Sequence, residues 1–255
     1  MTASQALVKV PQVTLAFWIM KICATTLGET GGDMFSMTFN WGYALSSIAL
    51  ISIFLVSLGV QMVAKGFNPW LYWTVILSTS TAGTTMSDYM DRTLKLGYMA
   101  GSLILASLLV IVLVTWRIVQ GSLSVDKISG GRAEAFYWTA ILVSNTLGTA
   151  LGDFLADSSG LGFLGGATLI GGLILLTTLA HFYTKISKVA LFWIAFVLTR
   201  PFGATFGDLL TKTHDKGGLD LGTRGSSAVL ATILIALIVW SLRKRPDIVS
   251  DELSF

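Results

Sequence analysis

The sequence predicts an all-α polytopic membrane protein, in which eight transmembrane helices form four parallel two-helix repeats. The first observation is composition: 53% of the 255 residues are hydrophobic and only 12% are charged, whereas soluble domains carry about 25% charged residues. The second is an internal repeat built on four aspartates, which we call the repeat aspartates. They are Asp33, Asp88, Asp153 and Asp208. A repeat of this length determines the architecture more strongly than any local feature does.

Each repeat aspartate follows a tryptophan by 15 residues and a glycine by five, with no gaps in the alignment. The tryptophans are Trp18, Trp73, Trp138 and Trp193, and the glycines are Gly28, Gly83, Gly148 and Gly203. Each repeat reads as a first helix that carries the tryptophan and ends near the aspartate, followed by a more apolar second helix. The predicted pairs are 12–34 with 40–64, 69–90 with 96–117, 133–154 with 161–183, and 187–209 with 225–242. Spans of this length cross a hydrocarbon core of roughly 30 Å.

The whole chain, 1–255, is therefore predicted to be a single membrane domain. Its internal repeats are expected at 9–66, 67–122, 131–186 and 187–245. The segment 118–132 reads as a cytoplasmic linker between two halves, and 246–255 as a polar C-terminal tail.

Lysine and arginine predict the orientation. One side of the predicted membrane holds ten basic residues: Lys9, Lys65, Arg117, Lys127, Arg132, Lys185, Lys188, Arg243, Lys244 and Arg245. The other side holds Arg92, Lys95, Lys212, Lys216 and Arg224. The positive-inside rule then places both termini in the cytoplasm and the repeat aspartates toward the outer face of a bacterial inner membrane. Since each repeat crosses twice, all four point the same way, and a pseudo-symmetry axis along the membrane normal is expected.

Several classes of function are not expected. The single Cys23 rules out an internal disulfide or a cysteine metal cluster. The net charge of +3 is small and lies mainly in loops and the tail, so nucleic acid is not an expected partner. The sequence shows no phosphate-binding G-x-x-x-x-G-K-[ST] motif, no arrangement typical of nucleophilic catalysis, and no sign of a covalently bound cofactor. The expected partners are the lipid bilayer, a transported ion or small solute, and, as one option, further copies of this chain.

The candidate binding residues are hard oxygen donors in or beside apolar helices. An ionisable residue in a membrane span is costly and is by default a functional candidate, and Glu29 lies within such a span. Carboxylates and hydroxyls suit Mn²⁺, Mg²⁺, Ca²⁺ or Na⁺ better than copper or zinc. The predicted ion- or substrate-binding set is Glu29, Asp33, Asp88, Asp153, Asp208, Thr25, Thr30, Thr85 and Asn145. Glu29, Asp33, Asp88 and Asp153 are the predicted metal ligands, which would hold a bound divalent cation.

A second set of residues would adjust the charge of the site. It comprises Lys21, Arg200, Asp91, Arg92, Asp157 and Lys212. Structural alternatives stay open for several residues: aspartates can cap helices, and glycines at a fixed offset can serve packing. Lys21 can snorkel to the interface or pair with an acid, and Asp208 with Lys212 can be an ordinary ion pair. The tryptophans read as interface anchors, and Pro201 as the site of a kink.

The fourfold pattern, with T-x-G-x-x-x-[GS]-D at the end of an aromatic-led helix, resembles the bacterial multi-pass family described as a "repeat of unknown function". This resemblance covers nearly the whole chain and implies an architecture. The segment Glu29-Thr30-Gly31-Gly32-Asp33 is also similar to the E-x-G-D-[KR]-[ST] signature of calcium/manganese–proton exchangers. It has one extra glycine and lacks the basic–hydroxyl pair that follows in that signature.

These observations favour a secondary transporter for a cation of the Mn²⁺, Ca²⁺ or Mg²⁺ class, with proton exchange as one form of coupling. One alternative is a channel or carrier for a small organic or anionic solute, recognised by Lys21, Arg92 and Arg200. Another is a membrane scaffold or sensor subunit that transports nothing.

Overall fold

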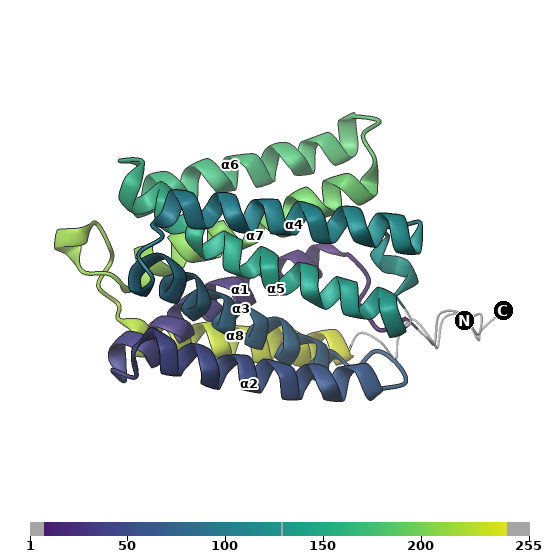
Figure 1. Ribbon diagram of the computed structural model, residues 1–255, viewed down its shortest axis with the longest axis horizontal. Helices are drawn as coiled ribbons and strands as arrows, with labels where there is room; N and C mark the ends of the chain where they lie inside the picture. Colours follow the sequence, from purple (N-terminus) through teal and green to yellow (C-terminus); the bar gives the residue numbers. More distant parts are fainter. Residues whose placement is uncertain (1–7, 129, 244–255) are drawn as a thin grey trace.

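The computed structural model describes residues 8–128 and 130–243. The predicted tail 246–255, together with Lys244 and Arg245, lies outside the described residues. Within them the chain forms eight α-helices and no strand, which confirms the all-α prediction (Figure 1). The helices are α1 (Leu15–Asp33), α2 (Gly42–Val63), α3 (Pro69–Asp88), α4 (Tyr98–Gln120), α5 (Gly131–Asp153), α6 (Gly162–Tyr183), α7 (Lys188–Thr211) and α8 (Thr223–Arg243). The first and last residue of each predicted helix lie within 3 residues of those in the structure.

Local signals set several of these ends. The side chain of Thr14 accepts a hydrogen bond from the backbone N–H of Phe17 and caps α1, and Asn68 does the same for α3, directly before Pro69. Such caps satisfy backbone donors that have no partner within the helix. Helix α4 ends directly before Gly121, whose left-handed backbone (φ 72°) suits glycine. Pro201 lies inside α7, and the helix continues through it to Thr211.

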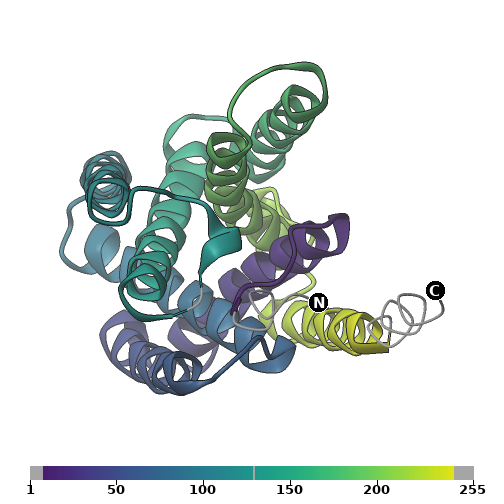
Figure 2. The same ribbon diagram turned by 90° about the vertical axis from the view of Figure 1, so that its right-hand side faces the viewer.

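The odd-numbered helices form a closed inner ring. Helix α1 packs against α3, α3 against α5, α5 against α7, and α7 back against α1. The even-numbered helices lie outside this ring, and each packs on the inner helix of the following repeat: α2 on α3, α4 on α5, α6 on α7, and α8 on α1. Figure 2 looks roughly along the helices and shows the outer helices around the inner ones. The outer helix of each repeat therefore covers the inner helix of the next repeat rather than its own.

Glycines bring the inner helices close together at all four contacts of the ring. The glycine five residues before each repeat aspartate faces the residue eight before the next aspartate. The four pairs are Gly28 with Ser80, Gly83 with Asn145, Gly148 with Arg200, and Gly203 with Thr25. A Cβ atom on Gly203 would lie 2.8 Å from the backbone carbon of Thr25, so a side chain does not fit there. The packing interpretation of these glycines is thus confirmed, and the helices are not interrupted at them.

Aromatic residues close the other end of the ring. The residue before each repeat tryptophan is also aromatic, and its ring meets the tryptophan of an adjacent repeat. The contacts are Phe17 with Trp73 at 5.8 Å, Tyr72 with Trp138 at 5.6 Å, Tyr137 with Trp193 at 6.4 Å, and Phe192 with Trp18 at 5.7 Å between ring centroids. Trp73, Trp138 and Trp193 are buried. The prediction that the repeat tryptophans are interface anchors is therefore wrong for these three, because each packs inside the ring against an aromatic residue of an adjacent repeat. We call these eight residues the aromatic layer.

Lys9 anchors the N-terminal segment through an ion pair and hydrogen bonds. The Nζ atom of Lys9 lies 2.8 Å from the Glu134 carboxylate in the first turn of α5 and donates to the carbonyl of Met62 at 2.8 Å. The backbone N–H of Lys9 also donates to the carbonyl of Ile128, in the connection between α4 and α5. Both charged side chains are buried. The predicted linker therefore forms part of a packed end of the molecule.

The inner and outer helices differ in polarity. Five helices are long and apolar enough to cross a membrane among the described residues: α2, α4, α6, α7 and α8. The outer helices expose large apolar side chains such as Val56, Ile111, Leu175 and Ile235, as lipid-facing helices do. Helices α1, α3 and α5 are more polar because their hydroxyls and charges face the ring and their neighbours cover them.

The glycine contacts yield a prediction about stability. Replacing Gly203 by alanine should lower the free energy of unfolding by about 1–3 kcal/mol, since the added methyl group collides with the α1 backbone and overpacks the interface. Gly59→Ala is the matched control, because Gly59 lies on the exposed face of α2 with nothing within 4 Å of an added Cβ. Thermal unfolding in detergent measures both, and equal stability of the two variants would contradict the close packing of the ring.

Candidate functional site

The interior of the ring holds a column of nine charged side chains, which we call the charged column. Its carboxylates are Glu29, Asp33, Asp88, Asp153 and Asp208, and its cations are Lys21, Arg92, Arg200 and Lys212. The five carboxylates are each exposed to 3% or less. The four repeat aspartates lie at similar depth because each ends the regular α-helical part of an inner helix or lies in its last turn. Buried charges of one sign require partners.

Two basic residues supply those partners at the end of the column where the repeat aspartates lie, which we call its mouth. Lys212 and Arg92 each follow a repeat aspartate by four residues, so each pairs with the aspartate of its own repeat and also reaches the next. The Nζ atom of Lys212 lies 3.0 Å from Asp208 and 2.5 Å from Asp33. Arg92 lies 2.9 Å from Asp88 and 3.0 Å from Asp153. The predicted pair of Asp208 with Lys212 is thus present, as part of a bridge between two repeats.

Lys212 follows the last residue of α7 and is 19% exposed. Burial opposes its charge, but the carboxylates of Asp208 and Asp33 outweigh that effect and raise the pKa of the amine above its ordinary value. Lys212 therefore stays protonated when the column is in this arrangement.

Arg200 and Glu29 form the next level of the column. The Nη1 atom of Arg200 lies 2.9 Å from Oε2 of Glu29. Arg200 also donates to the hydroxyls of Thr84 and Thr149, and both hydroxyls donate to the same Oε2 at 3.3 Å. Arg200, one of the predicted charge-adjusting residues, thus pairs directly with a carboxylate. Among the described residues, these contacts of Glu29 converge on one oxygen, so Oε1 is the atom available to a ligand.

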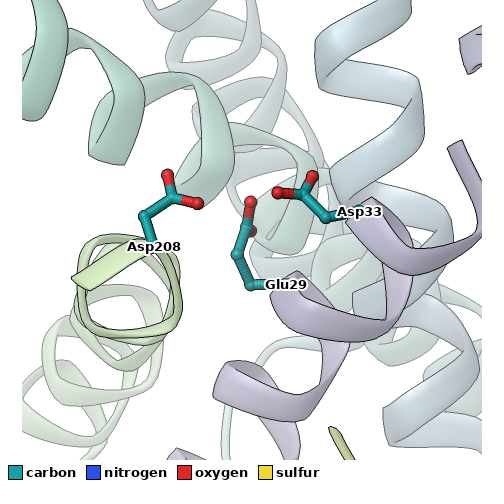
Figure 3. A group of neighbouring side chains, drawn as sticks. All are labelled: Glu29, Asp33 and Asp208. Carbon is teal, nitrogen blue, oxygen red and sulfur yellow. The ribbon is translucent and has the colours of Figure 1, made fainter. Parts of the chain in front are cut away.

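Three carboxylates converge between Lys212 and Arg200. Glu29 and Asp33 come from α1 and Asp208 from α7, and their side chains point toward one another (Figure 3). One oxygen from each lies within 4.8 Å of the others. We call these residues the carboxylate triad. Three buried oxygen donors of this kind suit a hard cation such as Mn²⁺, Mg²⁺ or Ca²⁺.

This grouping differs from the predicted metal ligands Glu29, Asp33, Asp88 and Asp153. The structure joins Glu29 and Asp33 to Asp208, whereas Arg92 holds Asp88 and Asp153 together in the other half of the ring. The reason is the closure of the ring, which places the fourth repeat beside the first.

Lys21 lies at the base of the column and is completely buried. Its Nζ atom lies 3.5 Å from Oδ1 of Asn145 and 4.1 Å from the centre of the Phe196 ring. Asn145 in turn donates to the hydroxyl of Thr79 at 2.8 Å. Neither predicted alternative describes Lys21, since it does not snorkel and forms no ion pair with a described carboxylate.

The remaining predicted residues lie elsewhere. The hydroxyl of Thr25 donates to the carbonyl of Thr199, Thr30 accepts from Ser227 of α8, and Thr85 donates to carbonyls of its own helix. The other two lie outside the ring: Asp91 packs against Gly101 of α4, and Asp157 accepts a hydrogen bond from Tyr98.

The sequence reading missed two residues of the site, Thr84 and Thr149. Both lie four residues before a repeat aspartate, the same repeat position as Glu29. Comparing the four repeats at that position would have found them. It also missed a π-helical turn that follows the aspartate in three repeats, at Met34–Thr38, Tyr89–Thr93 and Phe154–Ser158. Such turns are frequent at functional sites.

The buried ion pair yields a second prediction. Arg200→Met should destabilise the protein by about 3–5 kcal/mol, because it leaves the Glu29 carboxylate buried without its partner. Adding Glu29→Gln should restore a large part of that loss. Unfolding of the single and double variants forms a double-mutant cycle, and additive losses would contradict a direct pairing.

Comparison with known proteins agrees with the internal repeat. No curated protein and no solved structure gives a significant match. One family matches four times, over residues 16–67, 71–122, 136–187 and 191–246, which together cover most of the chain. Each match covers most of one inner helix and the whole of the outer helix that follows it. The chain belongs to the family described as Repeat of Unknown Function (DUF347).

Proposed function

We propose that this protein is a secondary transporter for a cation of the Mn²⁺, Ca²⁺ or Mg²⁺ class, and that the carboxylate triad is its binding site. The observation that carries the proposal is the convergence of Glu29, Asp33 and Asp208 inside the ring of inner helices. A buried cluster of three carboxylates is costly unless cations compensate it. Carboxylate oxygens are hard donors, which suit Mg²⁺, Ca²⁺ and Mn²⁺.

The present partners of the triad suggest how a cation would bind. Lys212 occupies one oxygen of Asp33 and one of Asp208, and Arg200 occupies one of Glu29. An arriving cation would displace Lys212 toward the solvent at the mouth of the column, where it is already partly exposed. On release of the cation, Lys212 would return, so that the carboxylates are compensated in both states.

Both ends of the column are covered in this structure. Lys212 and Arg92 bridge the aspartates at one end, and the aromatic layer fills the other. A carrier needs two such closures that open in turn, whereas a channel needs a continuous path. The arrangement favours a carrier driven by an ion gradient, and no residue of the triad is assigned a catalytic role.

We further propose that all eight helices cross a bacterial inner membrane, with both termini in the cytoplasm and the repeats arranged around an axis along the membrane normal. Helices of 19–24 residues are long enough. The repeated glycine and aromatic contacts around the ring support such an axis. Helices α1, α3 and α5 need no apolar surface because other helices shield them from lipid.

The anionic-solute alternative has less support. Arg92 and Arg200, two of its three recognition groups, are already paired with carboxylates. A scaffold without transport would not need a charged column in its interior, since apolar residues of similar volume stabilise a core at least as well as a buried ion pair.

Binding to the triad can be tested by thermal stability. At a concentration 100 times its dissociation constant, a cation that binds only the folded protein should add about 2.7 kcal/mol of stability. The panel is Mn²⁺, Mg²⁺, Ca²⁺ and Na⁺, applied to the wild type, Glu29→Gln and Asp208→Asn. The matched control is Asp157→Asn, which removes an exposed carboxylate outside the ring.

We expect the divalent shift to disappear in the two triad variants and to persist in the control. In proteoliposomes, uptake of the bound cation should likewise be lost in Glu29→Gln and Asp33→Asn, which remain folded. If no cation stabilises the wild type, or if both variants transport normally, the assignment of the triad is wrong.

The orientation has its own test. Replacing Cys23 by alanine leaves a chain without cysteine, into which Lys65→Cys or Lys95→Cys can be introduced. A membrane-impermeant maleimide should label the variant at position 95 in intact cells and the one at 65 only after the membrane is broken. The reverse pattern would invert the proposed topology.

A further inference from the structure

A groove opens on the surface of the molecule between the outer helix α8 and two helices of the inner ring, α1 and α3. Its volume is about 390 Å³, within the range of roughly 300–1,000 Å³ that is usual for small-molecule sites. Its walls are mainly apolar, with Leu27 on α1, Leu77 on α3 and Ala231 on α8. Among the described residues, the charged residue that lines it is Arg224, in the first turn of α8. We call this space the α8 groove.

A glycine on α1 keeps the α8 groove open. Gly31 lies two residues before its repeat aspartate, a position at which the other repeats carry Met86, Leu151 and Phe206. A Cβ atom on Gly31 would lie 3.5 Å from Cγ2 of Thr81, which is an ordinary contact. Close packing of the inner helices therefore does not require this glycine, unlike those that face the next helix of the ring. Its effect is to leave free a space that a larger side chain would fill.

The outer helices can be compared in the same way, because each begins at or directly after a glycine with a left-handed backbone. These glycines are Gly42, Gly97, Gly162 and Gly222. Six residues after its glycine, α8 carries Ala228, and two residues after it, the exposed Arg224. The counterparts of Ala228 are Ile48, Leu103 and Thr168, and those of Arg224 are Ala44, Met99 and Leu164. A small residue and a cation thus distinguish α8 from the other three outer helices.

Arg224 lies at the end of the α8 groove that is nearer to the repeat aspartates. Its guanidinium carbon lies 5.6 Å from the centre of the Phe39 ring, a contact that holds the charge beside the groove. No ion pair joins it to a carboxylate in the described part of the chain. The hydroxyl of Thr223, the preceding residue, lies 2.6 Å from that of Thr38. Ala231 lies deeper in the groove, about 10 Å from Arg224 along the helix axis.

We propose that the α8 groove binds one membrane phospholipid with an anionic headgroup. An acyl chain would lie in the apolar part, and the phosphate would bind Arg224. A guanidinium suits a phosphate because it donates two parallel hydrogen bonds, and basic pockets between membrane helices bind anionic headgroups. The headgroup would supply the partner that Arg224 lacks within the described chain. This inference goes beyond the proposed transport and does not depend on which ion the carboxylate triad binds.

The surroundings of the α8 groove favour a lipid over a water-soluble ligand. The outer helices expose large apolar side chains such as Val56 and Ile235, so the groove opens on a surface that lipid chains cover. Helix α8 packs mainly on α1 and makes few contacts with α3. A bound acyl chain would fill the space between α8 and α3. It would therefore join α8 more firmly to the ring, on the side of α1 that faces away from Glu29 and Asp33.

The test measures lipid binding by native mass spectrometry of the full-length protein purified in detergent. The probes are phosphatidylglycerol, which is anionic, and phosphatidylcholine, which is zwitterionic, with the same acyl chains. The wild type should bind one phosphatidylglycerol about tenfold more tightly than phosphatidylcholine, because a hydrogen bond between charged groups contributes that much. Arg224→Gln should bind the two lipids equally. Ala228→Leu, which fills the groove, should lose the bound lipid.

Two control variants should behave like the wild type. Lys95→Gln removes another basic residue at the same end of the molecule. Ser107→Leu adds the same side chain to a second apolar groove, of about 470 Å³ on α4, whose lining contains no cation. If Ala228→Leu does not fold, Gly31→Met fills the α8 groove from the other side with the residue that the second repeat carries.

Three outcomes would overturn the proposal. The first is an equal preference for phosphatidylglycerol in the wild type and Arg224→Gln, which is what an arginine that only reaches the membrane surface would give. The second is a lipid that stays bound in a folded variant with a filled groove. The third is displacement of the lipid by inorganic phosphate at the same concentration, which would identify the ligand as a free anion. We expect phosphate not to displace it, because phosphate makes no contact with the apolar part of the groove.

Discussion

The fold depends on one constraint, which is that carboxylates buried at the centre of a membrane protein must be compensated by charges from the same chain. The pair formed by Glu29 and Arg200 shows this most clearly. Both side chains are almost fully buried, and they lie 171 residues apart in the sequence. Their contact requires that the first and fourth repeats be neighbours. The contact of α1 with α7 that closes the ring therefore also brings these two charges together.

The four repeats share a backbone frame but divide the charges unequally. Four residues before the aspartate stand Glu29, Thr84, Thr149 and Ala204, and eight before it stand Thr25, Ser80, Asn145 and Arg200. Each position thus carries one charge among four copies. Because the ring brings equivalent positions to the same depth, one acid and one base on different repeats are enough to build a polar centre. The glycines at the interfaces keep those side chains within hydrogen-bonding distance.

Much of the fold could be predicted from the sequence because helix length, hydropathy and repeat register are local properties. Helix ends followed from the apolar runs and from the repeated positions of tryptophan and aspartate, and the pairing of Asp208 with Lys212 followed from their spacing of four residues. The order of helices around the ring is not local. The sequence shows that Asp33 and Asp208 are equivalent, but not that they touch. Three of the four repeat tryptophans were misread for a similar reason: a tryptophan near a helix end can face lipid headgroups or another helix, and only its neighbours decide which.

The choice of base at the mouth of the column distinguishes its two halves. Arg92 bridges the second and third repeats, and Lys212 bridges the fourth and first. A guanidinium is planar and binds two carboxylates through a fixed set of donors, and its ring contacts with Tyr43 and Tyr98 hold it further. An ammonium on a flexible stem exchanges more readily with another compact cation. The half closed by lysine is also the half that contains Glu29. The flexible lysine and the third carboxylate, Glu29, thus lie on one side of the ring. The more rigid arginine bridges the second and third repeats on the other side. For the proposed transport, this division allows the lysine side to open while the arginine side keeps the contacts that close the ring.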